Sequence, residues 1–298
     1  MDVIKTSAEH HFLASIEDIR HEPKGWVVGH FAFSQARSKP DFNPDFKKVL
    51  EKLSEDREQS IEFITQLENA VQGVKEGQIY LFADNDVVFL GRVNGDEQCR
   101  DIEKALGKIA EGQNVHSFTF AVLKNDIYAY QKMADRKMNG AKLFEAYEKM
   151  SDKSRISSIA ARRNRREHAL VLVIEDDRFT SSYATGILSK DYDVIVAKTG
   201  EEGITAYIEH APDIVFIDIH LPGINGHQAL QAIKSVDIKA FAVMLSVDTV
   251  KENIIGASKG GAKNFIKKPF SKERLIEAVK TSPYVRGSEM VEAGTIVN

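Results

Sequence analysis

The feature that most constrains the fold is a regular alternation of strand-like and helix-like segments after residue 168. Five short segments rich in β-branched residues are separated by amphipathic stretches with helical spacing. The strand-like segments are ALVLVI (169–174), DVIVA (193–197), DIVFID (213–218), AFAVMLS (240–246) and KNFIKK (263–268). Because strands alternating with helices build βαβ units with right-handed crossovers, the pattern predicts a doubly wound α/β domain with a parallel sheet covered on both faces.

The intervals between these strands supply the helices. They are SYATGILSK (182–190), EEGITAYIEHA (201–211), GHQALQAIKSV (226–236) and VKENIIGASKG (250–260), and KERLIEAVK (272–280) follows the fifth strand. The sequence therefore predicts a (βα)5 domain at residues 169–283, followed by a tail at residues 284–298.

Charged and hydroxyl side chains stand where the predicted strands end. Glu175 and Asp176 follow the first strand, Asp218 ends the third, Ser246 ends the fourth, and Lys268 follows the fifth. In a doubly wound sheet, ligands bind outside these carboxyl ends. Carboxylates gathered there repel one another without a cation, and Mg²⁺ prefers oxygen ligands. We therefore predict a magnesium site, in which Lys268 and Ser246 suit a phosphoryl group attached to Asp218.

Four stretches together resemble the receiver domains of two-component response regulators. They are VLVIEDD, DIVFIDIHLPGINGHQAL, Ser246 after FAVML, and GAKNFIKKPF, and the resemblance covers about residues 169–280. It implies a flavodoxin-like fold that accepts a phosphoryl group from a phosphohistidine. The implied roles are phosphoacceptor for Asp218, Mg²⁺ ligands for Glu175, Asp176, Asp218 and the backbone carbonyl of His220, phosphate partner for Lys268, switch hydroxyl for Ser246 and aromatic switch for Phe265.

The same resemblance implies how the domain signals. A sensor histidine kinase or phosphotransfer protein would donate the phosphoryl group, and the receiver would catalyse only its own phosphorylation. Ser246 would turn toward the phosphoryl group and let Phe265 turn inward, which reshapes the fourth helix, fifth strand and fifth helix (about residues 250–280). We expect that face to form a homodimer or bind a downstream protein target. Departures from the common pattern are Ser at 246, Val at 247 and His at 220, and Asp177 is expected to be a solvated neighbour or helix cap.

Residues 1–150 predict a second domain, of the α+β class. The expected elements are a helix at 7–20, a strand at 26–33, a helix at 43–71, strands at 78–83 and 87–93, a helix at 96–110, a strand at 116–123 and a helix at 127–150. Without the terminal helices the order is β-α-β-β-α-β, which is the ferredoxin-like, split βαβ arrangement.

The hairpin YLFADNDVVFLGR (80–92) lies between the second and third of these core strands. In topology and hairpin position the domain resembles the catalytic domain of diguanylate cyclases, the GGDEF family. Only Asp86 matches the motif, because Asp84 and Asn85 replace the glycines that let the backbone approach a nucleotide, and Val87 replaces the catalytic Glu. The resemblance implies a degenerate, non-catalytic relative. The alternative is that the DND sequence is simply a hairpin turn that tolerates left-handed backbone.

Residues 151–168 are basic and contain few large apolar side chains. We interpret them as a solvated linker, which is favoured over a helix that binds nucleic acid through Arg162, Arg163, Arg165 and Arg166. The net charge of −4 gives no overall nucleic-acid signature, and no helix-turn-helix follows the receiver. A histidine pair, His10-His11, is not accompanied by a Gly-rich nucleotide site and is interpreted as exposed.

Composition limits the class of protein. A chain of 298 residues that is 43% hydrophobic can build two cores, and no apolar run approaches the roughly 18 residues of a membrane helix. The N-terminus lacks signal-peptide character and Cys99 has no cysteine to pair with, so we expect a cytoplasmic protein. We predict a response regulator that switches a non-DNA-binding N-terminal interaction domain. The alternative function is a receiver-regulated nucleotidyl cyclase or another N-terminal enzyme, which the missing glycines and Glu disfavour.

Overall fold

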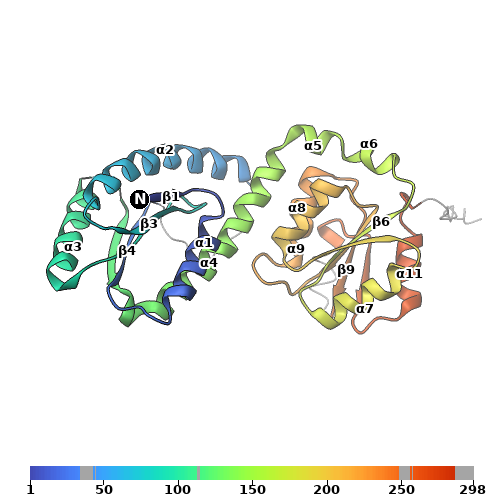
Figure 1. Cartoon of the computed structure of the whole chain (residues 1–298). Helices are drawn as coiled ribbons and strands as arrows, with labels where there is room; N and C mark the ends of the chain where they lie inside the picture. Colours follow the sequence, from blue (N-terminus) through green and yellow to red (C-terminus); the bar gives the residue numbers. More distant parts are fainter. Residues whose placement is uncertain (34–42, 44, 113–114, 248–255, 257, 286–298) are drawn as a thin grey trace, which may run out of the picture. The chain divides into compact units, whose positions relative to one another are not determined.

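The chain divides into two compact units, Met1–Phe144 and Glu145–Asn298. The computed structural model describes residues 1–33, 43, 45–112, 115–247, 256 and 258–285. Each unit has its own five-stranded sheet with helices on both faces (Figure 1). None of the described helices is both long and apolar enough to cross a membrane.

The N-terminal unit has a mixed sheet. Its strands are β1 (Asp2–Ile4), β2 (Trp26–Ala32), β3 (Glu76–Leu81), β4 (Val87–Arg92) and β5 (Ser117–Val122). The spatial order is β1-β3-β4-β2-β5, with β1 parallel to β3 and the other neighbours antiparallel. The four strands expected from the sequence are therefore present, and β1 is an additional short strand at the edge.

Helices cover both faces of this sheet because each carries one apolar stripe. The helices are α1 (Ala8–Ile19), α2 (Phe46–Ala70), α3 (Gly95–Glu111) and α4 (Leu123–Ser151). Residues of α1 and α4, among them Phe12 and Ile127, share one core with inward side chains of the strands. Residues of α2 and α3, among them Phe63 and Leu106, form the core on the opposite face. The predicted β-α-β-β-α-β order is present as β2-α2-β3-β4-α3-β5.

The C-terminal unit has an all-parallel sheet. Its strands are β6 (Leu170–Ile174), β7 (Asp193–Ala197), β8 (Ile214–Asp218), β9 (Ala242–Ser246) and β10 (Asn264–Lys267). The spatial order β10-β9-β8-β6-β7 is that of a flavodoxin-like doubly wound fold, which confirms the prediction for this domain. Every residue of β6, β8 and β9 is buried, which explains why these strands have continuous apolar sequences.

Among the described residues, two pairs of helices cover the two faces of the parallel sheet. They are α7 (Arg178–Leu188) and α11 (Lys272–Lys280) on one face, and α8 (Gly200–His210) and α9 (Gly226–Val236) on the other. Each helix starts after a residue whose side chain accepts a backbone N–H of the first turn: Asp177 for α7, Thr199 for α8, Asn225 for α9 and Ser271 for α11. The cap by Asp177 starts α7 four residues before the predicted helix. The helix predicted at 250–260 lies largely outside the described residues.

The basic segment is folded onto the C-terminal unit. It contains α5 (Lys153–Ser157) and α6 (Ile159–Asn164), and α5 packs beside α8. Ile159 is 3% exposed and Arg163 is 5% exposed. The interpretation of this segment as a solvated linker is therefore wrong for α6, because one of its arginines is buried among polar partners of the same unit.

A matched pair of glycine substitutions tests how tightly the loop after β8 is packed. A Cβ at Gly226 would lie 2.0 Å from the carbonyl oxygen of Asp218, whereas a Cβ at Gly186 in α7 would meet nothing within 4 Å. We expect Gly226→Ala to lower the free energy of unfolding by about 1–3 kcal/mol, because backbone must move. Gly186→Ala is expected to raise it by up to about 1 kcal/mol. Urea unfolding followed by circular dichroism measures both, and equal stabilities would contradict the packing.

Candidate functional site

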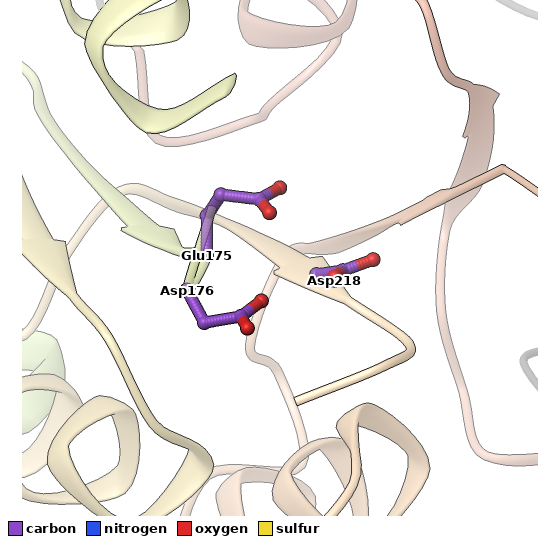
Figure 2. Close-up of side chains that lie close together, drawn as sticks. All are labelled: Glu175, Asp176 and Asp218. Carbon is purple, nitrogen blue, oxygen red and sulfur yellow. The ribbon is translucent and has the colours of Figure 1, made fainter. Parts of the chain in front are cut away.

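Three carboxylates gather at the carboxyl ends of β6 and β8. Oxygen atoms of Glu175, Asp176 and Asp218 lie within 4.8 Å of one another (Figure 2). They meet because β6 and β8 are neighbouring parallel strands, so their ends share one edge of the sheet. Glu175 and Asp218 are buried, and Asp176 is exposed to solvent. The predicted convergence of these acids is present.

Lys268 lies between two of the carboxylates. Its Nζ is 2.6 Å from Glu175 Oε2 and 3.0 Å from Asp218 Oδ1. The residue directly follows β10, and its backbone N–H donates to the carbonyl oxygen of Ser246 over 2.7 Å. Pairing of β10 with β9 therefore fixes the point from which the lysine reaches the acids.

One ammonium does not balance three carboxylates. Burial raises the pKa of Glu175, the ion pair with Lys268 opposes this, and the neighbouring charge of Asp218 raises it further. The net direction is upward, so the ionised form of Glu175 is under-compensated in the folded protein. The all-oxygen donor set and the excess negative charge are consistent with Mg²⁺ binding.

The remaining predicted site residues lie along the same edge or beside it. Ser246 is the last residue of β9, is fully buried and stands next to the position paired with Asp218. Phe265 is half-buried on β10, opposite Met244 of β9. His220 is exposed two residues after Asp218. The structure thus brings Ser246 to the acids by strand order, while the roles of Ser246, Phe265 and the His220 carbonyl stay predictions.

The C-terminal domain is similar to a known protein family. The family model described as the response regulator receiver domain matches residues 171–280. The chemotaxis protein CheY of Bacillus subtilis is similar, with 36% identity over 111 residues that make up 37% of this chain and 92% of CheY. The chain belongs to the response regulator receiver family. CheY of Thermotoga maritima is 37% identical over 111 residues, which are again 37% of this chain and 92% of that protein.

Among solved structures, a CheY-like receiver domain protein from Methanospirillum hungatei matches with 24% identity and a TM-score of 0.37. It covers 38% of this chain and 92% of the other. The family model leaves residues 1–170 unassigned. The chain is therefore a response regulator receiver joined to an N-terminal domain of unknown function.

A buried acid outside the cluster holds the receiver loop that follows Asp218. Glu201 of α8 is 3% exposed, and its Oε1 accepts the backbone N–H of Ile224 over 3.0 Å. Gly223 has a φ of 80°, and a Cβ there would lie 2.4 Å from Glu201 Oε1. The role of Glu201 cannot be read from the sequence, because an acid in the first turn is common in any helix.

Asp177 is separate in role from its acidic neighbours. Its side chain accepts the backbone N–H of Thr180 over 2.7 Å and caps α7. It is exposed to solvent. The prediction of a solvated cap is confirmed for this residue.

The DND sequence of the N-terminal domain forms a tight and buried hairpin turn. Asn85 has a φ of 71°, which agrees with the alternative that the DND sequence is a hairpin turn tolerating left-handed backbone. Asn85 and Asp86 are each 1% exposed. The side-chain amide of Asn85 donates to the Leu53 carbonyl over 2.7 Å, and the Ser60 hydroxyl donates to the Asn85 carbonyl over 2.8 Å. Helix α2 therefore covers the turn.

A histidine and a lysine of the same domain pair with the two aspartates. His30 Nε2 lies 2.8 Å from Asp86 Oδ2, and Lys137 Nζ contacts both Asp84 and Asp86. Burial acts to raise the pKa of Asp86, but the hydrogen bond from His30 and the charge of Lys137 outweigh it and leave the pKa lowered. The turn is thus occupied by its own domain's side chains. His10 and His11 are exposed on α1, as expected.

Magnesium should stabilise the receiver through the acidic cluster. We expect millimolar Mg²⁺ to raise the melting temperature of the native chain relative to EDTA, because a ligand that binds only the folded state stabilises it by mass action. Asp176→Asn removes one carboxylate and should abolish most of this shift. Differential scanning calorimetry with and without Mg²⁺ measures it.

Asp177→Asn is the matched control, since asparagine also caps helices and Asp177 points its carboxylate at α7. This variant should keep the full magnesium shift. Loss of the shift in both variants, or in neither, would contradict a site built on Glu175, Asp176 and Asp218.

Proposed function

We propose that this protein is a two-component response regulator in which Asp218 accepts a phosphoryl group from a phosphohistidine. The observation that carries the proposal is the position of Lys268 Nζ, 3.0 Å from Asp218 Oδ1 at the edge that also holds Glu175 and Asp176. A lysine and several acids at one strand-end edge suit a phosphoryl group better than a neutral ligand. A histidine kinase or phosphotransfer protein is the partner that this chemistry requires.

The side chains divide the reaction between them. The Asp218 carboxylate oxygen attacks phosphorus, the P–N bond to the donor histidine breaks, and the imidazole leaves with the bond's electron pair. Lys268 would exchange one of its two carboxylate partners for a phosphoryl oxygen. Glu175, Asp176, Asp218 and the His220 carbonyl would hold Mg²⁺, which when bound supplies positive charge for the phosphoryl oxygens. The receiver thus catalyses its own phosphorylation.

Ser246 and Phe265 are proposed as the switch. Ser246 is buried at the edge beside Asp218, and Phe265 lies half-buried on the adjacent strand β10. A hydroxyl that turns toward the phosphoryl group would open space beside β10 and favour an inward Phe265. We propose that the face around β10 and α11 then binds a second copy or a downstream protein. Residues 250–255 and 257, which the prediction also included, lie outside the described residues.

The N-terminal domain is proposed to be a ferredoxin-like interaction domain without catalytic activity. The order β3-β4-β2-β5 of its core strands, with antiparallel neighbours, supports the split βαβ arrangement. If the domain is a degenerate relative of the GGDEF family, its hairpin cannot serve a nucleotide. Asn85 and Asp86 are buried, and Lys137 and His30 occupy the carboxylates that a metal would need. The cyclase alternative has no such support.

Phosphorylation of Asp218 can be tested with acetyl phosphate. We expect the native chain to gain one phosphoryl group only when Mg²⁺ is present, and Asp218→Asn to gain none because its amide is not a nucleophile. Intact mass and Phos-tag gels measure the product. Asp193→Asn, which changes an exposed aspartate at the start of β7, is the matched control and should be phosphorylated normally. Undiminished labelling of Asp218→Asn would contradict the assignment.

The absence of cyclase activity is equally testable. Incubation of the purified chain with GTP or ATP and Mg²⁺ or Mn²⁺ should yield no cyclic mono- or dinucleotide by mass spectrometry, with or without acetyl phosphate. The reason is that the backbone of the DND turn is covered by α2 and its acids are already paired. Turnover that Asp86→Asn abolishes, in a variant with an unchanged circular dichroism spectrum, would promote the enzyme alternative.

A further inference from the structure

Three arginines of the basic segment bind the carboxyl end of receiver helix α8. We use the name connector for residues 145–166 and arginine clamp for Arg162, Arg163 and Arg166. Arg162 donates to the carbonyl oxygens of Ile208 and Glu209 over 2.7 and 2.6 Å. These carbonyls belong to the last turn of α8, where no intrahelical donor remains and the helix dipole is negative. The guanidinium therefore acts as a cap from another segment.

Arg163 is the buried centre of the clamp. Its Nε donates to the Pro212 carbonyl over 3.0 Å, and its Nη2 lies 2.8 Å from both the Tyr207 hydroxyl and Asp237 Oδ2. The guanidinium also stacks over the ring of Tyr284 at 4.2 Å. Asp237 is the residue that ends α9, so this one side chain ties the connector to the ends of α8 and α9 together.

Two further side chains, Arg166 and Lys149, extend the contacts along the connector. Arg166 donates to the Ala211 carbonyl over 2.9 Å and lies 3.1 Å from Asp213, which itself accepts the Leu170 N–H over 2.7 Å. Lys149 near the end of α4 lies 2.5 Å from Glu209. The surface at the ends of α8 and α9 is thus rich in acceptors, and the connector is its occupant.

The clamp lies at the opposite end of the sheet from Asp218. Asp213 directly precedes β8 and Asp218 ends it, which separates the two by about 16 Å of extended chain. Helices α8 and α9 run between these edges. At the Asp218 edge, Glu201 of α8 holds the N–H of Ile224, and Asn225 caps α9. Both helices therefore begin beside the loop that follows Asp218 and end at the arginine clamp.

We propose that the arginine clamp is the joint through which the receiver controls the connector. The proposal rests on the proposed function, because phosphorylation of Asp218 supplies the signal. A change in the loop after Asp218 moves α8 and α9, which are packed rigid elements, and so alters the acceptor positions around Arg163. All three guanidinium groups are already paired, so a displacement of their acceptors weakens hydrogen bonds that are already made. The clamp then loosens and releases the connector from the receiver.

The clamp also explains why the segment contains several arginines, without requiring that they bind nucleic acid. Of the four arginines considered as phosphate contacts, Arg162, Arg163 and Arg166 donate to receiver groups, and Arg165 is exposed. Guanidinium groups that face protein carbonyls and carboxylates have fewer donors left for a nucleic-acid backbone. Three of the arginines in this segment thus serve an internal contact.

Hydrogen exchange on the full chain tests the joint, with fluoroberyllate and Mg²⁺ as the phosphoryl mimic. In the native chain we expect amides of residues 153–166 to exchange at least threefold faster with the mimic than without it. Arg163→Gln should exchange fast in both states, because the buried centre of the clamp is lost. Arg165→Gln, an exposed neighbour, should behave as the native chain. Asp237→Asn keeps an acceptor for Arg163 and should show an intermediate response.

The outcomes separate this proposal from the proposed function. An unchanged connector in the native chain, while residues 264–280 respond to the mimic, overturns the joint and leaves the response regulator standing. A full native response in Arg163→Gln also overturns it. Failure of acetyl phosphate to modify Asp218 removes the proposed function itself, and the joint falls with it. If Arg163→Gln is unfolded by circular dichroism, Asp237→Asn decides: a native-sized response there overturns the joint.

Discussion

Repulsion among three carboxylates at one sheet edge is the constraint around which the receiver is arranged. Parallel strands bring Glu175, Asp176 and Asp218 together, and only Lys268 among the described residues is paired with two of them. Two hydrogen bonds hold the nearby segments in place against this repulsion. Glu201 accepts the backbone N–H of Ile224 in the loop after β8, and the backbone N–H of Lys268 donates to Ser246 of β9. An edge of this kind keeps excess negative charge in the folded protein, which is consistent with a site that binds Mg²⁺.

Much of this arrangement could be predicted from residue patterns. Strands of a parallel sheet are buried on both faces, so β6, β8 and β9 have continuous apolar sequences with clear ends. Since carboxyl ends of parallel strands meet, the strand assignment alone placed Asp218 beside Glu175 and Asp176. Strand β1 has three residues, which are too few to show a period in the sequence. Helix α7 begins before the predicted helix, because Asp177 caps it although the amphipathic pattern starts only at residue 182.

What could not be predicted depends on partners far away in sequence that have no side-chain signature. The groups that bind Arg162, Arg163 and Arg166 are mostly backbone carbonyls 44 to 49 residues away, and any residue can provide a carbonyl. High charge density in the connector therefore pointed to solvent. The DND turn is similar: its local sequence predicted a left-handed residue, but the pairing of Lys137 with Asp84 and Asp86 spans 53 and 51 residues.

The clamp on α8 and α9 has a consequence in the reverse direction. Thermodynamic linkage is reciprocal. If the phosphoryl mimic favours release of the Arg163 contacts by some factor, a molecule that favours the intact contacts by the same linkage must weaken binding of the mimic by that factor. The connector is continuous with α4, which begins at Leu123 in the N-terminal domain. If the proposed joint operates, a partner that restrains the connector would therefore weaken binding of the mimic at Asp218. On that proposal the N-terminal domain would be an input to Asp218 as well as an output from it.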